Sequence, residues 1–302
     1  MKDQIIGHNE VISFFDKVIS AGNLGHAYCF VGPAMVGKKR VAIEISADLL
    51  GVDFDKLSRQ PDFLIIEQEK NTKTGKTKKN IDIDQIRNLK NFVRCKPFVA
   101  KYKSVIIDGA EKMNLASYNG LLKTLEEPSQ HTVIFLITHD ETALPETILS
   151  RCQMIYFYPV FFTEIIKFVG SEYIELVNKS LGLPGLVKKW IDEPDAYNAY
   201  NMEVQRFLSL IGKPFYKKMS IVDELFGDKV DHIATRSNLL DVLAIWQEQL
   251  RFFIPFGSNV KRNEIPFSDV LKVYDSIFEA RIKLNQNIHP RLLVDNILLS
   301  IP

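Results

Sequence analysis

The chain of 302 residues carries 38 lysines and arginines against 37 aspartates and glutamates, a formal net charge of +1 at pH 7. A nearly neutral chain lacks the basic surface that binds nucleic acid by bulk electrostatics, so any contact with DNA must be local or shared with partners. The length predicts two or three domains, and 46% hydrophobic and 25% charged residues are typical of a globular protein. No apolar segment has the length of a signal peptide or a membrane span, so we expect a cytoplasmic protein without membrane contact.

In chain order, apolar runs alternate with helical patterns through the first half of the chain. Strands are expected at residues 27–31, 63–66, 104–108 and 132–138, and helices at 3–22, 40–50 and 112–128. Residues 81–93 are expected to form a short strand that runs into a helix, with Asp84 as the cap of that helix. The alternation predicts an α/β doubly wound domain whose parallel sheet is covered on both faces.

The stretch from Gly32 to Lys39, GPAMVGKK, follows the first strand and nearly matches the phosphate-binding loop G-x-x-x-x-G-K-[S/T]. Gly32, Gly37 and Lys38 fit, because the glycines let backbone N–H groups curl around a phosphate and Lys38 reaches the outer phosphates. The last position should carry a metal-binding hydroxyl, but the ammonium of Lys39 repels a metal cation. The sequence therefore predicts a degenerate phosphate loop with no metal site and leaves nucleotide binding open. A glycine-containing turn unrelated to phosphate is the alternative.

The strand at 104–108 ends in Asp108, where nucleotide-hydrolysing folds place a second carboxylate associated with magnesium. Working ATPases of this kind continue with a glutamate that activates water, and here Gly109 follows. Lys39 and Gly109 remove the metal ligand and the base independently. This coincidence favours a protein that has lost ATP hydrolysis.

The lysine-rich segment at 70–80 and the three cysteines are the remaining features of the sequence. Residues 70–80 contain five lysines and no acid, which indicates either a solvated loop or a DNA-facing patch. Cys29, Cys95 and Cys152 are far apart and form no C-x-x-C pair, so we expect buried thiols and neither disulfides nor zinc.

The motifs GPAMVGKK, SVIID, NGLLKTLEEP and ILSRC closely resemble, in this order, the clamp-loader branch of the AAA+ superfamily. Among bacterial members the likeness is to the delta-prime type of DNA polymerase III subunit, whose nucleotide site is characteristically degenerate, and QPDFLIIE is similar to that type as well. NQNIHPRLLVDNILLSI is similar to the last helix of the family. The resemblance implies an AAA+ nucleotide-binding-like domain at 1–160, a small helical lid domain at 161–203 and an all-α collar domain for oligomerisation at 204–302. From about residue 201 the patterns are helical, and in 239–253 apolar residues recur at three and four.

The chain departs from the family in two ways. Many relatives carry a four-cysteine zinc module after the loop helix, but residues 49–60 contain no cysteine, so zinc is not expected. Family members that hydrolyse ATP place an arginine at the fourth position of G-x-x-R in the lid helix, and here that position is Gly185.

Residues 150–152 match the S-R-C motif of the clamp-loader family. The resemblance implies that Arg151 is an arginine finger supplied in trans to the ATP of a neighbouring subunit. Arginine suits this role because its planar guanidinium can bridge two phosphate oxygens and stays charged. An ordinary surface or salt-bridged arginine is the alternative, since the motif has only three residues.

We therefore expect a non-hydrolysing, delta-prime-like subunit of the DNA polymerase III clamp loader, part of a DNA polymerase holoenzyme, that helps to load the sliding clamp onto primed DNA. Its expected partners are ATPase motor subunits, a delta-like subunit, the sliding clamp and, through the hetero-oligomer, primed DNA. No cofactor is expected to be required. The alternatives are an ATP-hydrolysing gamma- or tau-like motor subunit and a stand-alone regulatory protein with a phosphate loop.

Overall fold

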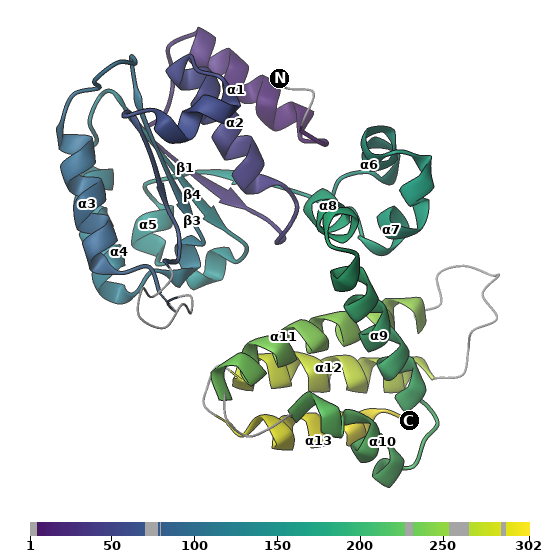
Figure 1. Ribbon diagram of the computed structural model, residues 1–302. Helices are drawn as coiled ribbons and strands as arrows, with labels where there is room; N and C mark the ends of the chain where they lie inside the picture. The colour runs from purple at the N-terminus through teal and green to yellow at the C-terminus, as the bar shows by residue number, and fades with distance from the viewer. Residues whose placement is uncertain (1–4, 70–77, 79, 227–231, 254–265, 285–287) are drawn as a thin grey trace. The chain divides into compact units, whose positions relative to one another are not determined.

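The computed structural model describes residues 5–69, 78, 80–226, 232–253, 266–284 and 288–302 (Figure 1). The chain forms two compact units, residues 1–191 and 192–302. The lysine-rich segment at 70–80 lies outside the described residues except for Lys78 and Asn80. No helix in the described ranges is both long enough and apolar enough to cross a bilayer.

The first unit is built on a five-stranded parallel sheet with the strand order β2-β3-β4-β1-β5. The strands are β1 (Ala27–Val31), β2 (Phe63–Ile66), β3 (Lys103–Asp108), β4 (Thr132–Thr138) and β5 (Gln153–Tyr156). The four expected strands are confirmed, with β3 beginning one residue early, whereas β5 was not expected. Because all neighbours are parallel, the carboxyl ends of the strands meet at one edge of the sheet, where open α/β sheets bind ligands.

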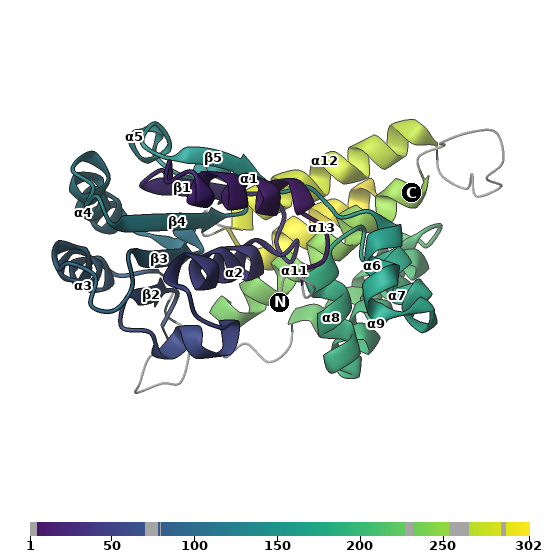
Figure 2. The ribbon, with the colours of Figure 1, turned by 90° about the horizontal axis from the view of Figure 1, so that it is seen from above.

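Helices cover both faces of this sheet (Figures 1 and 2). They are α3 (Ile83–Arg94) and α4 (Leu115–Glu126) on one face, and α1 (Asn9–Ser20) and α2 (Lys38–Leu50) on the other. Successive residues of a strand point to opposite faces, so Cys29 of β1 packs on the α3 side and its neighbour Phe30 on the α2 side. Burial on both faces explains the continuous apolar runs of the sequence and confirms the doubly covered parallel sheet.

Helix α3 is capped by a residue that the sequence analysis did not choose. Asp82 is the N-cap and forms a capping box with Gln85, whose side-chain oxygen accepts from the Asp82 backbone N–H at 3.1 Å. The prediction that Asp84 caps the helix is wrong: Asp84 lies in the first turn, and of the two acids Asp82 has the glutamine three residues later. The short strand expected before this helix is also wrong, because Ile81 makes only an isolated bridge.

A buried aspartate holds the loop that leads into β3. The Asp62 carboxylate accepts hydrogen bonds from the backbone N–H groups of Phe98, Val99 and Ala100 at 2.6, 2.7 and 2.9 Å. Burial alone would raise the pKa of Asp62, but these three hydrogen bonds lower it below its usual value. The carboxylate therefore stays ionised and fixes the backbone of this loop.

The short helix α5 (Glu146–Leu149) packs on the sheet core through Ile148. After β5, the first unit ends in short helices with a small core of their own, which are α6 (Phe162–Val169), α7 (Ile174–Lys179) and α8 (Pro184–Asp192). Val160, Ile165, Val177 and Val187 are buried together among α6, α7 and α8. This cluster is separate from the two that cover the sheet.

In its described residues the second unit consists of helices joined by short turns and contains no strand (Figure 1). Its helices are α9 (Pro194–Leu210), α10 (Phe215–Val222), α11 (His232–Gln249), α12 (Phe267–Leu284) and α13 (Pro290–Ser300). The apolar pattern predicted at 239–253 supplies the core, because Leu239, Leu243, Trp246 and Leu250 are all buried. The Lys218 ammonium, also buried, donates to the Ile301 carbonyl just past the end of α13 at 2.5 Å.

Helix α12 has two apolar faces. One face packs in the core through Val270, Val273, Ile277, Ala280 and Leu284. A second row, spaced by three and four residues, is between 43% and 51% exposed and consists of Phe267, Leu271, Tyr274, Phe278 and Ile282. Helical spacing places this exposed row along a single stripe of the helix.

The three cysteines are all free. Cys29 is buried and Cys152 partly buried, but Cys95 is exposed, so the expectation of a buried thiol is wrong there. Cys95 is the C-cap of α3, where the chain leaves the apolar face of that helix. In the described parts of the chain, no three His, Cys, Asp or Glu side chains are grouped so that they could hold a metal ion.

Candidate functional site

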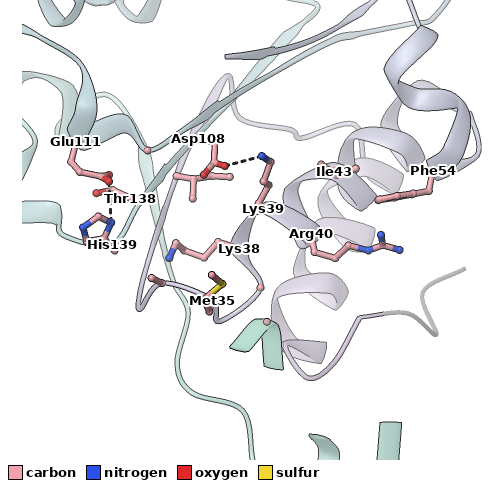
Figure 3. Close-up of a pocket in the computed structure, with 15 residues that line it drawn as sticks. Met35, Lys38, Lys39, Arg40, Ile43, Phe54, Asp108, Glu111, Thr138 and His139 are labelled. Carbon is pink, nitrogen blue, oxygen red and sulfur yellow. Dashed lines mark ion pairs between the residues drawn. The ribbon is translucent and has the colours of Figure 1, made fainter. Parts of the chain in front are cut away.

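A cavity of about 510 Å³ lies where the degenerate phosphate loop meets the carboxyl ends of β3 and β4 (Figure 3). The loop, the start of α2, the residues after β3 and β4, and Gly185 of α8 form its walls. Of the residues selected from the sequence, Gly37 and Lys38 line this cavity, and Gly32 contributes a carbonyl to the same loop. A side chain at Gly32 would overlap the carbonyl oxygen of Phe157, which explains the glycine.

The Lys38 side chain lies folded inside the loop, and only 6% of the residue is exposed. Its ammonium donates to the carbonyl oxygens of Gly32 and Pro33 at 2.5 and 2.7 Å. Burial lowers the pKa of Lys38 to about 8, against the opposing influence of the Glu111 and Asp108 carboxylates. Lys38 is therefore mainly charged at pH 7 and gives the loop a fixed positive group.

Lys39 occupies the position of the missing hydroxyl and forms ion pairs with two carboxylates. Its ammonium lies 2.6 Å from the Glu67 carboxylate and 3.0 Å from that of Asp108, and Figure 3 shows the side chain reaching across to Asp108. Burial opposes the charge on Lys39, but the hydrogen bonds to Glu67 and Asp108 outweigh it and raise the pKa of the ammonium. This position therefore stays cationic over the whole physiological range.

Phosphate loops of this type imply a bound magnesium ion, and the residues present do not fit one. Magnesium requires a near-ideal octahedron of oxygen ligands. At the hydroxyl position this chain presents the Lys39 ammonium, which neutralises Asp108 and would repel a divalent cation. The residues present at this position therefore do not fit a bound magnesium ion.

Glu67 was missed by sequence reasoning although a signal was present. It follows β2 directly, and the pairing of Ile66 with Ile107 places it beside Asp108. Carboxylates that follow two adjacent parallel strands lie at the same edge of a sheet. Only the strand order, which the sequence did not reveal, shows that β2 and β3 are neighbours and that Glu67 therefore lies beside Asp108.

The residue directly after β3 cannot serve as a catalytic base. Gly109 has φ +77°, a left-handed conformation that strains any L side chain, so a glutamate would be disfavoured there. The nearby Glu111 lines the cavity, but the His139 ring nitrogen Nδ1 lies 2.9 Å from its carboxylate. Burial alone would raise the pKa of Glu111, but the His139 hydrogen bond contributes to a net lowering.

Gly185, where the family places the lid arginine, touches the phosphate loop directly. Its backbone N–H donates to the Met35 carbonyl oxygen at 2.8 Å. A Cβ at Gly185 would lie 2.7 Å from that oxygen, closer than real contacts allow. Met35 itself adopts φ +61°, so the loop backbone is turned toward α8 at this point. This contact leaves no room for an arginine at position 185.

A second cavity of about 520 Å³ adjoins the first and shares Gly37, Arg40 and Gly185 with it. Its remaining walls include the apolar residues Ile5, Ile6, Phe168, Val169 and Ile191, together with the polar His8 and Lys188. The Arg40 guanidinium lies 3.6 Å from the ring centre of Phe54, which lines the first cavity. The two cavities thus share part of their walls at the phosphate loop and the start of α8.

Arg151 does not line either cavity. It follows α5, and its guanidinium donates to the Thr147 carbonyl oxygen at 2.8 Å and to the Glu126 carboxylate at 2.9 Å. The Arg151 and Glu126 side chains are 34% and 48% exposed. Arg151 is therefore a salt-bridged surface arginine in this chain, away from the degenerate loop.

The chain is similar in sequence to subunits of DNA polymerase III. A delta' subunit of DNA polymerase III from Pseudomonas aeruginosa is 36% identical over 42% of this chain and 41% of its own length. A tau subunit of DNA polymerase III from Bacillus subtilis is 27% identical over 59% of this chain and 33% of its own. The chain thus spans less than half the length of these curated relatives.

The fold has a counterpart among solved structures. The crystal structure of a DNA polymerase III gamma subunit-related protein from Thermotoga maritima superposes with a TM-score of 0.56 at 20% identity, covering 94% of this chain and 97% of that one. The family model described as DNA polymerase III, delta subunit, matches residues 7–161, slightly more than half of the 302 residues. The chain therefore belongs to the DNA polymerase III delta subunit family.

Proposed function

We propose that this protein is a non-hydrolysing, delta-prime-like subunit of the DNA polymerase III clamp loader that helps to place the sliding clamp on primed DNA. The ion pair between Lys39 and Asp108 carries the proposal, because it replaces the metal that phosphoryl transfer requires. Gly109 and Gly185 support it, since both backbones disfavour the side chains that an ATPase would need there.

In this proposal the subunit contributes Arg151 in trans to the ATP of a neighbouring motor subunit. Its own loop has no use for such a group, and Arg151 lies outside the cavities that flank the loop. The ion pair to Glu126 is partly exposed, and exposed pairs contribute only about 0–1 kcal/mol, so the guanidinium can exchange this partner for a phosphate at little cost.

The same proposal assigns the helices after the sheet to a lid domain and a collar domain. Residues 161–203 correspond to the lid domain, and residues 204–302 to the collar that joins subunits. The exposed stripe of α12 supports the collar assignment, because Phe267, Leu271, Tyr274, Phe278 and Ile282 offer an apolar surface beyond what the unit's own core uses. Motor subunits, a delta-like subunit, the clamp and primed DNA are the proposed partners.

Reconstitution tests this function. The chain is combined with the tau or gamma and delta subunits of its own organism, and ATP hydrolysis and clamp loading on primed DNA are measured. We expect the full complex to load clamps and Arg151→Ala to assemble normally while losing most of the ATPase activity at one site, since arginine fingers contribute ~10³ to 10⁵ in rate. Normal loading by the Arg151→Ala complex at limiting ATP would remove the finger assignment.

A motor subunit of the same complex is the second candidate, favoured by the position of the Glu111 carboxylate in the cavity wall. An ATPase assay on the isolated chain distinguishes a scaffold subunit from a motor subunit. A scaffold subunit shows no magnesium-dependent ATP turnover above background, whereas a motor turns over at roughly 1 per second or more. Glu111→Gln should then abolish that turnover.

A further inference from the structure

A groove in the second unit is lined mainly by uncharged polar side chains. Helices α9 and α10 and the residues that follow α10 enclose a cavity of about 730 Å³ there. Along α9 the polar side chains of the groove recur at three and four residues and therefore form one stripe of the helix: Asn198, Asn201, Gln205 and Ser209. Ser220 of α10 belongs to the opposite wall. The core does not use this stripe, because the buried residues of α9 are Tyr200, Phe207 and Leu210.

The charges of the groove favour a basic partner. Arg206 is the only cation among the described residues that line it, and two acids already hold its guanidinium. The Arg206 Nε lies 3.3 Å from the Glu203 carboxylate, and its Nη2 lies 3.4 Å from the Glu224 carboxylate. The Arg206 side chain is only 13% exposed, whereas that of Glu224 is 82% exposed. The rim of the groove therefore presents a carboxylate to solvent, which attracts a cation and repels an anion.

Arg206 also joins the two walls of the groove. Its Nη1 donates to the Ile221 carbonyl oxygen of α10 at 3.2 Å. The Ser209 hydroxyl donates to the Arg206 carbonyl oxygen at 2.7 Å. These contacts tie the side chain that separates the walls to both helices, so the groove is formed before any partner binds.

We propose that this groove binds an extended segment of another polypeptide that carries a lysine or arginine. A side-chain amide both donates and accepts hydrogen bonds, as a peptide group does. Successive turns of α9 are about 5.4 Å apart, close to the two-residue repeat of about 6.6 Å in an extended chain. Asn198, Asn201 and Gln205 can therefore contact peptide groups on one edge of the bound segment, and its basic side chain pairs with Glu224.

Other macromolecules fit this groove less well. A helix uses its backbone N–H and C=O groups internally and would need an apolar surface, but the apolar side chains that line the groove are those of Met202 and Ile221. A nucleic-acid strand brings phosphates that must be neutralised by cations, and Arg206 is already paired with two acids. The inference concerns the second unit and does not depend on the clamp-loader role.

Selection from a displayed library of random decapeptides on the immobilised full chain tests the proposal. The most enriched peptide is synthesised with a fluorescent label, and its affinity is measured by fluorescence anisotropy. We expect it to contain a lysine or arginine. N-methylation of one alternate set of its peptide bonds should weaken binding at least about tenfold, because methylation removes backbone donors and leaves the side chains in place. Failure to select any peptide, or a peptide that tolerates methylation of either set, would overturn the proposal.

Variants of the groove locate the bound peptide. Asn198→Ala combined with Gln205→Ala replaces two exposed amides by a good helix former and should weaken binding about tenfold. Glu224→Lys should weaken binding of the basic peptide to a similar extent and strengthen binding of a version with glutamate in place of its basic residue. Asp275→Lys, the same change of charge at an exposed position of α12 outside the groove, is the control and should bind like the wild type. Circular dichroism confirms that each variant is folded. Wild-type affinity in both groove variants would place the peptide elsewhere and contradict the assignment.

Discussion

The Arg151 guanidinium lies 2.9 Å from the Glu126 carboxylate, so the proposed trans-acting group is held by an acid that closes helix α4 of its own chain. Glu126→Gln weakens this pair without touching the arginine. We expect the reconstituted complex with Glu126→Gln to keep wild-type ATPase activity within about twofold, because an exposed pair contributes at most about 1 kcal/mol. Steady-state hydrolysis at limiting ATP measures it. A Glu126→Gln complex as inactive as Arg151→Ala would show that the intramolecular pair, and not a phosphate contact, is what matters.

Gly185→Ala should destabilise the first unit. The added Cβ would lie 2.7 Å from the Met35 carbonyl oxygen, a backbone atom that cannot swing away. Overpacking of this kind costs about 1–3 kcal/mol in unfolding free energy, measurable by urea denaturation. Lys189→Ala, an exposed change in the same helix, serves as control and should stay within about 0.5 kcal/mol of the wild type. Gly185→Arg should destabilise at least as much and should confer no ATPase activity.

The buried Lys38 should make the free energy of unfolding depend on pH in the alkaline range. Its pKa falls from 10.5 to about 8 on folding, so between these values the unfolded chain binds a proton that the folded chain does not. The free energy of unfolding therefore contains a contribution that rises with pH in this window, by up to about 3 kcal/mol. Lys38→Met lacks it, so any stability advantage of this variant at pH 7 should shrink as the pH approaches 10. A constant difference between the two proteins would show that Lys38 titrates normally.

The three hydrogen bonds to Asp62 predict a large effect of its removal. Asp62→Ala leaves the buried N–H groups of Phe98, Val99 and Ala100 without their acceptor and should cost about 3 kcal/mol or more in unfolding free energy. Asp55→Ala, at an exposed site in the preceding segment, should cost little. Because folding lowers the pKa of Asp62, its contribution is complete above about pH 4 and is lost as the pH falls through the folded value. Wild type and Asp62→Ala should therefore converge in stability under acid, as followed by thermal unfolding.

The exposed apolar stripe of α12 should contribute strongly to the affinity of this chain for its partner subunits. Phe278→Asp places a charge on that stripe without entering the core, so the variant should fold normally but bind its partner subunits at least about tenfold more weakly. Lys272→Asp introduces the same side chain on the charged side of the same helix and should assemble like the wild type. Analytical ultracentrifugation of the reconstituted complex gives both values. Equal affinities would place the subunit contact elsewhere.

Much of the fold could be predicted because local sequence encodes it. Strands buried on both faces read as continuous apolar runs, so β1, β3 and β4 were expected almost to the residue. The edge strand β2 is only partly buried, but its residues are all apolar and it was expected as well. The opposite edge gave a weaker signal, because β5 is only partly buried and has a single apolar pair, Met154 and Ile155, at its centre. Two neighbouring acids likewise gave no basis for choosing Asp82 over Asp84 until the Gln85 partner was considered.

The candidate site was predicted only as far as one motif reaches. GPAMVGKK identified the loop and the unusual Lys39, and in the structure residues of this loop line the cavity while Lys39 pairs with Asp108. The ion pair with Glu67 joins residues 28 positions apart, and the Gly185 contact joins α8 to Met35. Such long-range pairs depend on strand order and helix packing, which composition and periodicity do not specify.

The Lys39 ammonium also changes how this pocket responds to its surroundings. A metal ion exchanges with solvent and follows the free magnesium concentration, whereas an ammonium group is part of the chain and is present in every copy. Since the Asp108 and Glu67 hydrogen bonds raise the pKa of Lys39, its charge withstands any physiological change of pH. The positive charge beside Asp108 is thus a fixed part of the polypeptide. Depletion of magnesium, which removes the metal ion from ordinary phosphate loops, would leave the charge at this position unchanged.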